Sequence, residues 1–176
     1  KGVAEVTATV IDIGESFRVE RSIARVLVTE AKDRLSAVAK ATVLTGEVPE
    51  GHTGLLYVDG ELESELKPGP YAFWKFNRSI SVDLVDLRVR ALEVGGQEIL
   101  TRDKVSLRIN LTASYRFTDA LKAAKTVKDA LDYLYKEIQF GLRAAVGTRT
   151  LDALLEDKGV VDSAVFDHVR EKFAAI

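Results

Sequence analysis

A strict alternation of apolar and polar residues from Val105 to Phe117 constrains the fold more than any other feature of the chain. Apolar side chains, among them Leu107, Ile109 and Leu111, occupy every second position, and every position between them is polar. Successive side chains of a strand point to opposite faces. The pattern therefore predicts a long antiparallel strand with one face on a core and the other in water.

At Thr118 the period of the apolar residues changes. From Leu121 to Ala145 they recur every three or four residues, which predicts helices. Thr126 with Asp129 fits a capping box that divides this stretch into a short helix and a longer one. A sheet followed by helices is the expected order.

Upstream of the long strand, glycine and proline punctuate short apolar runs, as in a sheet built from hairpins. Asp59-Gly60 separates Leu55–Val58 from Leu62–Leu66, and this dipeptide favours a tight hairpin turn. We expect Gly95-Gly96 to form another turn. The segment from Tyr71 to Phe76 is predicted to be an aromatic strand.

The first residues carry two further predicted elements. Ala4 to Ile13 alternates and predicts a strand. The spacing from Val19 to Val43 favours a helix, while Val26–Val28 also fit a strand. Residues 1–46 are therefore expected to form an N-terminal extension. Val10–Ile13 resembles Leu84–Leu87 in pattern. This pattern fits either two unrelated strands or an extension that is the remnant of a duplicated unit.

These elements predict an α+β fold with a mixed, mainly antiparallel β-sheet subdomain followed by a helical subdomain. After the extension, the expected domain covers residues 47–176. Its β-rich subdomain spans residues 47–117 and its helical subdomain residues 118–176.

Composition narrows the function. With 25 basic and 27 acidic residues the formal net charge is −2, so the chain lacks the basic footprint of a nucleic-acid-binding protein. Cysteine is absent, which excludes disulfides and thiolate chemistry. No run approaches the roughly 18 apolar residues of a membrane-spanning helix. We therefore expect the segment itself to be soluble, which leaves open whether a membrane anchor lies outside it. The chain has no methionine, even at its first position, which indicates a segment of a longer protein.

The chain offers few residues for catalysis. Its two histidines, His52 and His168, lie far apart in the sequence, and neither is in a glycine-rich elbow with a serine. Nucleophilic catalysis needs a nucleophile beside a base and an orienting group. No spacing of metal ligands is visible either. We therefore predict no catalytic residues, no cofactor and no metal. The acidic row at 59, 61, 63 and 65 is best explained as a solvated hairpin face.

Two sets of apolar residues are candidates for contact with a partner. On the aromatic strand, one alternating face is expected in the core, and the other faces a partner or lipid beside two cations. In the helices, the apolar faces are expected to serve subunit assembly. The candidate interaction surface consists of Tyr71, Phe73, Trp74, Lys75, Phe76, Arg78, Leu134, Ile138, Val165, Val169 and Phe173.

Four motifs in order carry a family resemblance from about Val48 to Phe173. They are VPEGHTGLLYVDGELESELKPGPYAFW, VDLVDLRVRALEV, GGQEILTRDKVSLRINLTASYRFTD and YLYKEIQFGLRAAVGTRTLDALLEDK. This order resembles the SPFH or band 7 superfamily of stomatin, prohibitin and flotillin, and within it the bacterial stomatin-like proteins (slipins). Where that family usually has Asp-Pro before the first helix, this chain has Asp119-Ala120.

The resemblance implies a non-enzymatic, membrane-associated scaffold on the cytoplasmic side. It implies homo-oligomers that organise membrane microdomains or regulate membrane proteases or channels, with a membrane serine protease among the expected partners. The alternative from the residues is a monomeric module that binds lipid or protein through the aromatic strand at 71–78.

Overall fold

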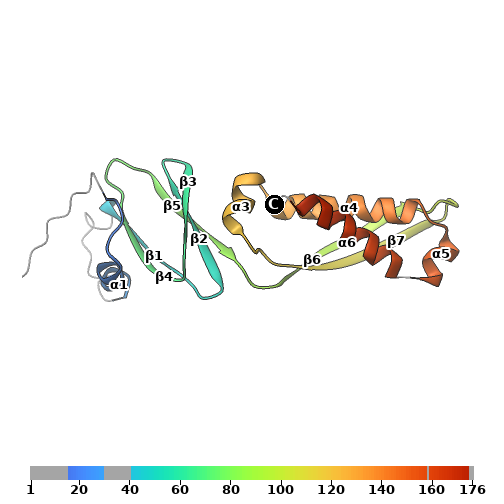
Figure 1. Cartoon of the computed structure of the whole chain (residues 1–176), viewed down its shortest axis with the longest axis horizontal. Helices are drawn as coiled ribbons and strands as arrows, with labels where there is room; N and C mark the ends of the chain where they lie inside the picture. The colour runs from blue at the N-terminus through green and yellow to red at the C-terminus, as the bar shows by residue number, and fades with distance from the viewer. Residues whose placement is uncertain (1–15, 30–40, 158, 175–176) are drawn as a thin grey trace, which may run out of the picture. The chain divides into compact units, whose positions relative to one another are not determined.

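The computed structural model describes residues 16–29, 41–157 and 159–174 of the chain. Its elements divide into an N-terminal unit that ends at Asp86 and a C-terminal unit that begins at Leu87. Each unit is described by itself (Figure 1). The division differs from the predicted subdomains at 47–117 and 118–176, because the last two strands pack with the helices rather than with the earlier strands.

Hairpins build the N-terminal unit, as the sequence predicted. β2 (His52–Val58) pairs antiparallel with β3 (Glu61–Leu66) and with β5 (Ile80–Asp86), in the order β3-β2-β5. Asp59 and Gly60 join β2 to β3 with φ angles of 52° and 86°, the left-handed conformation that this hairpin turn requires. A second sheet pairs β1 (Val43–Val48) antiparallel with β4 (Gly69–Trp74).

One apolar cluster in this unit draws on both of its sheets. Val48 and Phe73 come from β1 and β4, and Leu56, Leu66 and Ile80 come from β2, β3 and β5. Leu56 is completely buried. The two sheets thus share this cluster as a common core.

A helix covers the opposite face of the β1–β4 sheet. α1 (Arg21–Thr29) contributes Ala24, which clusters with Val43 of β1 and Ala72 of β4, and Leu27 and Trp74 pack against them. Ala72 and Trp74 alternate along β4 with Tyr71 and Phe73, so β4 is covered on both faces. A strand buried on both faces is apolar throughout.

The predicted helix from Val19 to Val43 is wrong at its C-terminal end. Residues 30–40 lie outside the described part, and Val43 begins β1, where it lies opposite Trp74. The β-branched residues of β1 gain pairing and packing on the sheet, and such tertiary contacts override local spacing. The strand predicted from Ala4 to Ile13 also lies outside the described residues.

A long hairpin opens the C-terminal unit. β6 (Arg90–Leu100) pairs antiparallel with β7 (Ser106–Tyr115). Along β7, burial alternates as the sequence predicted, with Leu107, Ile109 and Leu111 facing the core. The α+β class with mainly antiparallel strands before helices is confirmed.

The turn predicted at Gly95-Gly96 is wrong, because both glycines lie within β6. The register shifts between Val94 and Gln97, which makes this a β-bulge. Gly96 has a φ of 68°, and its N–H donates to Asn110 Oδ1 at 2.7 Å. A glycine in the left-handed conformation is typical of such a bulge.

Four helices follow the hairpin: α3 (Ala120–Thr126), α4 (Ala130–Gly147), α5 (Leu151–Glu156) and α6 (Gly159–Phe173). The predicted division into a short and a longer helix is confirmed, but the capping box is not. Asp129 itself is the N-cap of α4, and its carboxylate accepts from the N–H groups of Leu131 and Asp132. An aspartate at this position satisfies amides that the helix leaves unpaired.

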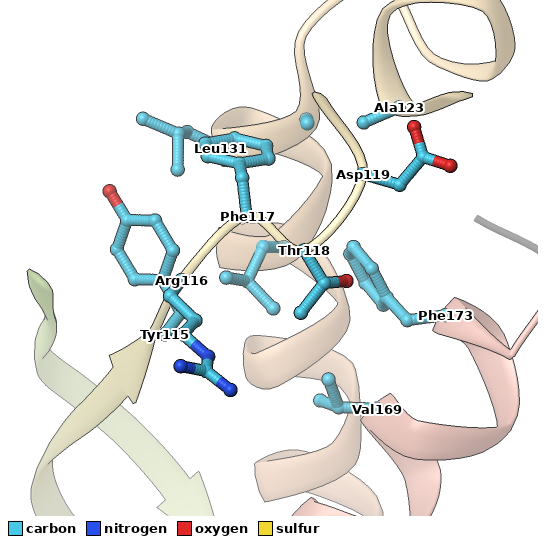
Figure 2. Close-up of a pocket in the computed structure, with 11 residues that line it drawn as sticks. Tyr115, Arg116, Phe117, Thr118, Asp119, Ala123, Leu131, Val169 and Phe173 are labelled. Carbon is cyan, nitrogen blue, oxygen red and sulfur yellow. The ribbon is translucent and has the colours of Figure 1, made fainter. Parts of the chain in front are cut away.

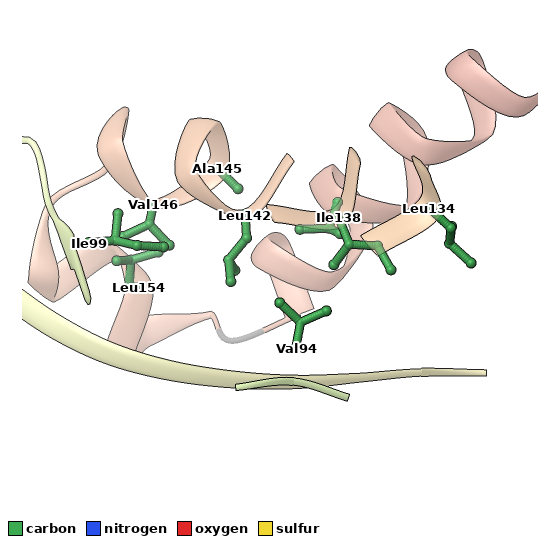
Figure 3. Close-up of a cluster of buried hydrophobic side chains, with 9 residues drawn as sticks. Val94, Ile99, Leu134, Ile138, Leu142, Ala145, Val146 and Leu154 are labelled. Carbon is green, nitrogen blue, oxygen red and sulfur yellow. The ribbon is translucent and has the colours of Figure 1, made fainter. Parts of the chain in front are cut away.

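One face of α4 packs on the hairpin. Its buried residues Leu134, Ile138, Leu142 and Val146 form a cluster that includes Val94 of β6 (Figure 3). α6 returns antiparallel along α4, since Phe173 lies beside Tyr133 with ring centroids 5.2 Å apart, and His168 lies beside Glu137, with Nε2 2.9 Å from Oε2.

Candidate interaction surface

The aromatic strand is shorter than the sequence predicted. β4 ends at Trp74, and Phe76 lies in a turn, so the prediction of a strand to Phe76 and beyond is wrong. Asn77 has a φ of 53°, and the Arg78 N–H donates to the Lys75 carbonyl at 3.1 Å. This turn reverses the chain into β5.

Both faces of β4 are occupied within the protein. Phe73 is 3% exposed and its ring lies 5.6 Å from that of Tyr71, so this face lies in the core as predicted. Burial raises the pKa of the Tyr71 hydroxyl above its ordinary value of 10.0. Trp74 lies on the face that the sequence assigned to a partner or lipid, but there it packs with the α1 cluster. Among the described residues, its indole N–H has no acceptor.

The turn after β4 leaves one aromatic side chain exposed. Phe76 is 58% exposed, and Lys75 beside it is half-buried. The Arg78 guanidinium lies over the ring of Phe17, 5.1 Å from its centroid. The exposed remainder of the predicted aromatic surface is therefore Phe76 with its neighbouring cations.

The helical candidates divide into core and surface residues. Leu134, Ile138 and Val165 are 9%, 2% and 5% exposed and belong to the core cluster of the C-terminal unit. They pack in the core of this unit, and all three also line a groove that is described below. Val169 and Phe173 are half-buried and line an apolar hollow, and Val169 also lines a second one.

The first hollow, of about 240 Å³, lies where β7 leads into α3 (Figure 2). Phe117, Leu131, Val169 and Phe173 are among the apolar residues that line it. Asp119 also lines it, but the Asp119 carboxylate accepts the Lys122 N–H at 2.8 Å as the N-cap of α3. This hollow therefore offers apolar packing with few polar contacts.

The second hollow is a groove of about 320 Å³ between β7 and α6. Leu111 and Ala113 of β7 line one wall, and Asp162, Val165 and Phe166 of α6 line the other. Phe166 is 65% exposed. The sequence reasoning missed it, because Phe166 falls outside the apolar face of α6 that carries Val165 and Val169.

The histidines lie in separate hydrogen-bonded settings. Nδ1 of His52 lies 3.2 Å from the Glu50 carbonyl oxygen, and its Nε2 lies 4.0 Å from Asp86 Oδ2. His168 Nε2 lies 2.9 Å from Glu137 Oε2. Neither ring hydrogen-bonds to a serine hydroxyl within the described ranges. The contacts of the two histidines hold strands and helices in place. They do not bring a nucleophile together with its base.

The acidic row follows the predicted alternation along β3. Glu61, Glu63 and Glu65 are exposed, and Leu66 on the opposite face is buried. Glu65 accepts the Thr53 hydroxyl at 2.7 Å, and Glu63 pairs with Arg18 at 3.4 Å. In residues 16–29, 41–157 and 159–174, no group of three or more His, Cys, Asp or Glu side chains is placed to hold a metal ion.

None of the helices in the described part of the chain combines the length and apolar character needed to span a membrane.

Comparison with known families identifies the class of protein. The model of the SPFH domain / Band 7 family matches residues 46–176. This match covers most of the chain, and the antiparallel strands followed by helices are consistent with it. The chain belongs to the SPFH / Band 7 family.

Several relatives share parts of the sequence. An uncharacterized protein of Methanocaldococcus jannaschii is 29% identical over 134 residues, which cover 76% of this chain and 64% of the relative. A stomatin homolog of Pyrococcus horikoshii is 36% identical over 43% of this chain and 28% of its own length. Stomatin-3 of Caenorhabditis elegans is 38% identical over 42% of this chain and 28% of its own length. The chain thus spans less than two thirds of each of these relatives.

Proposed function

We propose that this chain is part of a non-enzymatic, membrane-associated scaffold that forms homo-oligomers. The observation that carries this proposal is the family match over residues 46–176, and the relatives that bear the name stomatin support it. The scaffold organises membrane microdomains or regulates membrane proteases or channels from the cytoplasmic side. A membrane serine protease is the first partner to test.

Two measurements on the chain test this function. Sedimentation velocity over a wide concentration range should show species larger than the monomer. Flotation with vesicles of phosphatidylcholine and phosphatidylglycerol should show whether the chain itself contacts lipid. A chain that stays monomeric at the highest concentration contradicts homo-oligomerisation through these residues.

A second candidate function is a monomeric module that binds lipid through the turn after β4. It is favoured by one observation, the exposed Phe76 beside Lys75 and Arg78, because an aromatic ring with nearby cations suits the headgroup region of a bilayer. Trp74 is excluded from this contact by its packing with α1.

Flotation of Phe76→Ser tests this second function. Phe140→Ser is a matched control, since Phe140 is also exposed, at 54%, but lies on α4. Lipid contact through the turn predicts that only Phe76→Ser floats less than the wild type. Equal flotation of both variants excludes this contact.

A further inference from the structure

The hairpin of the C-terminal unit has two edges without a strand partner in the part of the chain that the structure describes. β6 and β7 form a sheet of their own, so each strand pairs on one side only. Unpaired backbone amides and carbonyls along a strand edge are a template for pairing with another strand. Both strands are long, with eleven residues in β6 and ten in β7.

The outer faces of the two strands carry opposite charges. Glu93 and Glu98 are exposed on β6, and Arg108 is exposed on β7, with Arg116 just beyond the end of β7. Within the hairpin, Glu98 lies opposite Arg108. An opposite-charge pair across two strands is stabilising and a like-charge pair is destabilising.

This charge pattern distinguishes between the ways in which edges of two copies can pair. Pairing β7 with β7 about Thr112 places Arg108 opposite Arg116 of the second copy. Pairing β6 with β6 about its bulge places Glu93 near Glu98 of the second copy. Pairing β7 with β6 in the register of the hairpin places Arg108 between two glutamates, Glu98 of each copy. Of these three arrangements, the last is the one that alternates the charges.

The helices that cover the hairpin also present different residues at its two edges. With 100° of rotation per residue, Phe166 lies about 160° around α6 from His168, which faces α4. Phe166 therefore points away from α4, over the groove beside β7. On α4, Arg143 lies on the side away from α6 and hydrogen-bonds to Gln97 of β6 at 3.3 Å.

The positions of these residues along the axes of α4 and α6 also match. Since Tyr133 lies beside Phe173 and Glu137 beside His168, Arg143 is level with the turn of α6 that carries Asp162 and Phe166. A second copy placed in the same orientation beside β7 brings its own Arg143 to this turn. There it faces the Asp162 carboxylate, and its α4 covers the Phe166 ring.

We propose that copies of this chain join head to tail through the C-terminal unit, with β7 and the α6 groove of one copy receiving β6 and α4 of a second copy. The proposal rests on the homo-oligomer of the proposed function and assigns its surfaces. The two surfaces differ, so each copy keeps one free edge. Such a contact generates a ring when the rotation closes and a filament when it does not.

Charge reversal at Arg143 and Asp162 tests the arrangement, because the two residues lie on opposite edges of one chain. Arg143→Glu places a glutamate against Asp162 at every contact, and Asp162→Arg places an arginine against Arg143. Each variant alone should assemble less readily than the wild type. In sedimentation velocity at low salt, the protein concentration needed for assembly should rise about tenfold or more. An equal mixture should assemble again, because the contact between the two substituted edges pairs the new glutamate with the new arginine.

Asp167→Arg and Lys122→Glu are matched controls, as both residues are exposed and lie outside the two edges. They should assemble like the wild type. Phe166→Ser provides a second, uncharged test and should also weaken assembly. Circular dichroism reports whether each variant is folded, and recovery in the mixture requires that both are.

The outcomes separate the two proposals. Suppose that the wild type assembles. If the single variants and Phe166→Ser then assemble equally well, the head-to-tail surfaces are wrong and the homo-oligomer stands. The same conclusion follows if the mixture of folded variants does not recover assembly. If the wild type stays monomeric at every concentration, both are overturned.

Discussion

Gly54 is a residue at which the backbone of the N-terminal core is closely packed. It lies in β2, the central strand of its sheet, and is buried. A Cβ atom there would lie 3.0 Å from Val48 Cγ2, 3.0 Å from Val82 Cγ1 and 3.2 Å from Leu66 Cβ. Three neighbours from three strands approach its backbone, so a side chain cannot be added without displacing the core.

Gly54→Val should lower the free energy of unfolding by about 1–3 kcal/mol, as overpacked cores do. Urea denaturation measures the change. Gly95→Val is the matched control, since the nearest atom to a Cβ at Gly95 is Asn110 Oδ1 at 3.6 Å. An equal effect at both glycines would contradict this account of the core.

Asp103 ties the loop between β6 and β7 to the start of α5. Its carboxylate accepts the Thr101 hydroxyl at 2.6 Å and the Leu151 N–H at 3.2 Å. The Thr101 hydrogen bond first, and then backbone hydrogen bonds and the charge of Arg102, hold the pKa of this carboxyl below its ordinary value of 3.8. The ionised form is therefore the one that stabilises the fold.

The stability that Asp103 contributes should be present above its ordinary pKa and be lost as the pH falls through its lower folded pKa. Asp103→Asn cannot titrate, so the wild type should be more stable than this variant at neutral pH. The difference in melting temperature should narrow on acidification below about pH 4. Asp167→Asn shows how far removal of another exposed carboxylate changes the profile. A constant difference at all pH values would contradict the expectation.

At the scale of elements, the contact between α4 and α6 depends on a glycine. A Cβ at Gly141 would lie 3.2–3.3 Å from three atoms of His168. His168 is held in place by its contact with Glu137, so the ring has little freedom to move aside. Glycine inside a helix is unfavourable by itself, and here it allows the two helices to approach.

Gly141→Ala should therefore destabilise the wild type but stabilise a His168→Ala background, where helix propensity alone contributes about 0.8–1 kcal/mol. A double-mutant cycle followed by urea denaturation measures the coupling. The same sign in both backgrounds would show that His168 does not limit the approach of the helices.

Periodic elements could be predicted from the sequence because their burial is one-sided. The alternation of β7 and the spacing of α4 each reflect a single core face. The Gly95-Gly96 bulge was mistaken for a turn, since both use glycine with positive φ. The sequence places Asp129 at the third helical position of a capping box rather than at the N-cap, because acidic side chains are favourable both at the N-cap and in the first turn of a helix.

The interaction surface was harder to predict than the fold. A strand buried on both faces and a strand with one partner-binding face are both apolar throughout, so β4 did not reveal α1 as the element that covers Trp74. Phe166 gave no periodic signal, because its role depends on the neighbouring edge of β7. Such surfaces are set by tertiary arrangement, which local patterns do not encode.

At the scale of the whole molecule, each unit has buried clusters of its own. The single tryptophan of the chain, Trp74, lies in the N-terminal unit. Four of the five described helices lie in the C-terminal unit. Tryptophan fluorescence and the helical circular dichroism signal therefore report mainly on different units.

Asp129→Ala should lower the midpoint of the helical transition, because loss of this N-cap destabilises α4 by about 1 kcal/mol. The fluorescence transition of Trp74 should keep its wild-type midpoint. Asp129→Asn retains a capping oxygen and should restore most of the loss. If both signals shift together, the units unfold as one cooperative body.

The packing of α1 on β4 has a practical consequence for how this protein is produced. The family match begins at residue 46, and Arg21–Thr29 lies before it. A chain trimmed to that boundary would expose Ala72 and Trp74 to solvent as a bare hydrophobic sheet face, and such patches promote aggregation. Particles seen with the trimmed chain would then be aggregates rather than ordered assemblies, so expression for any assembly assay should begin upstream of Phe17.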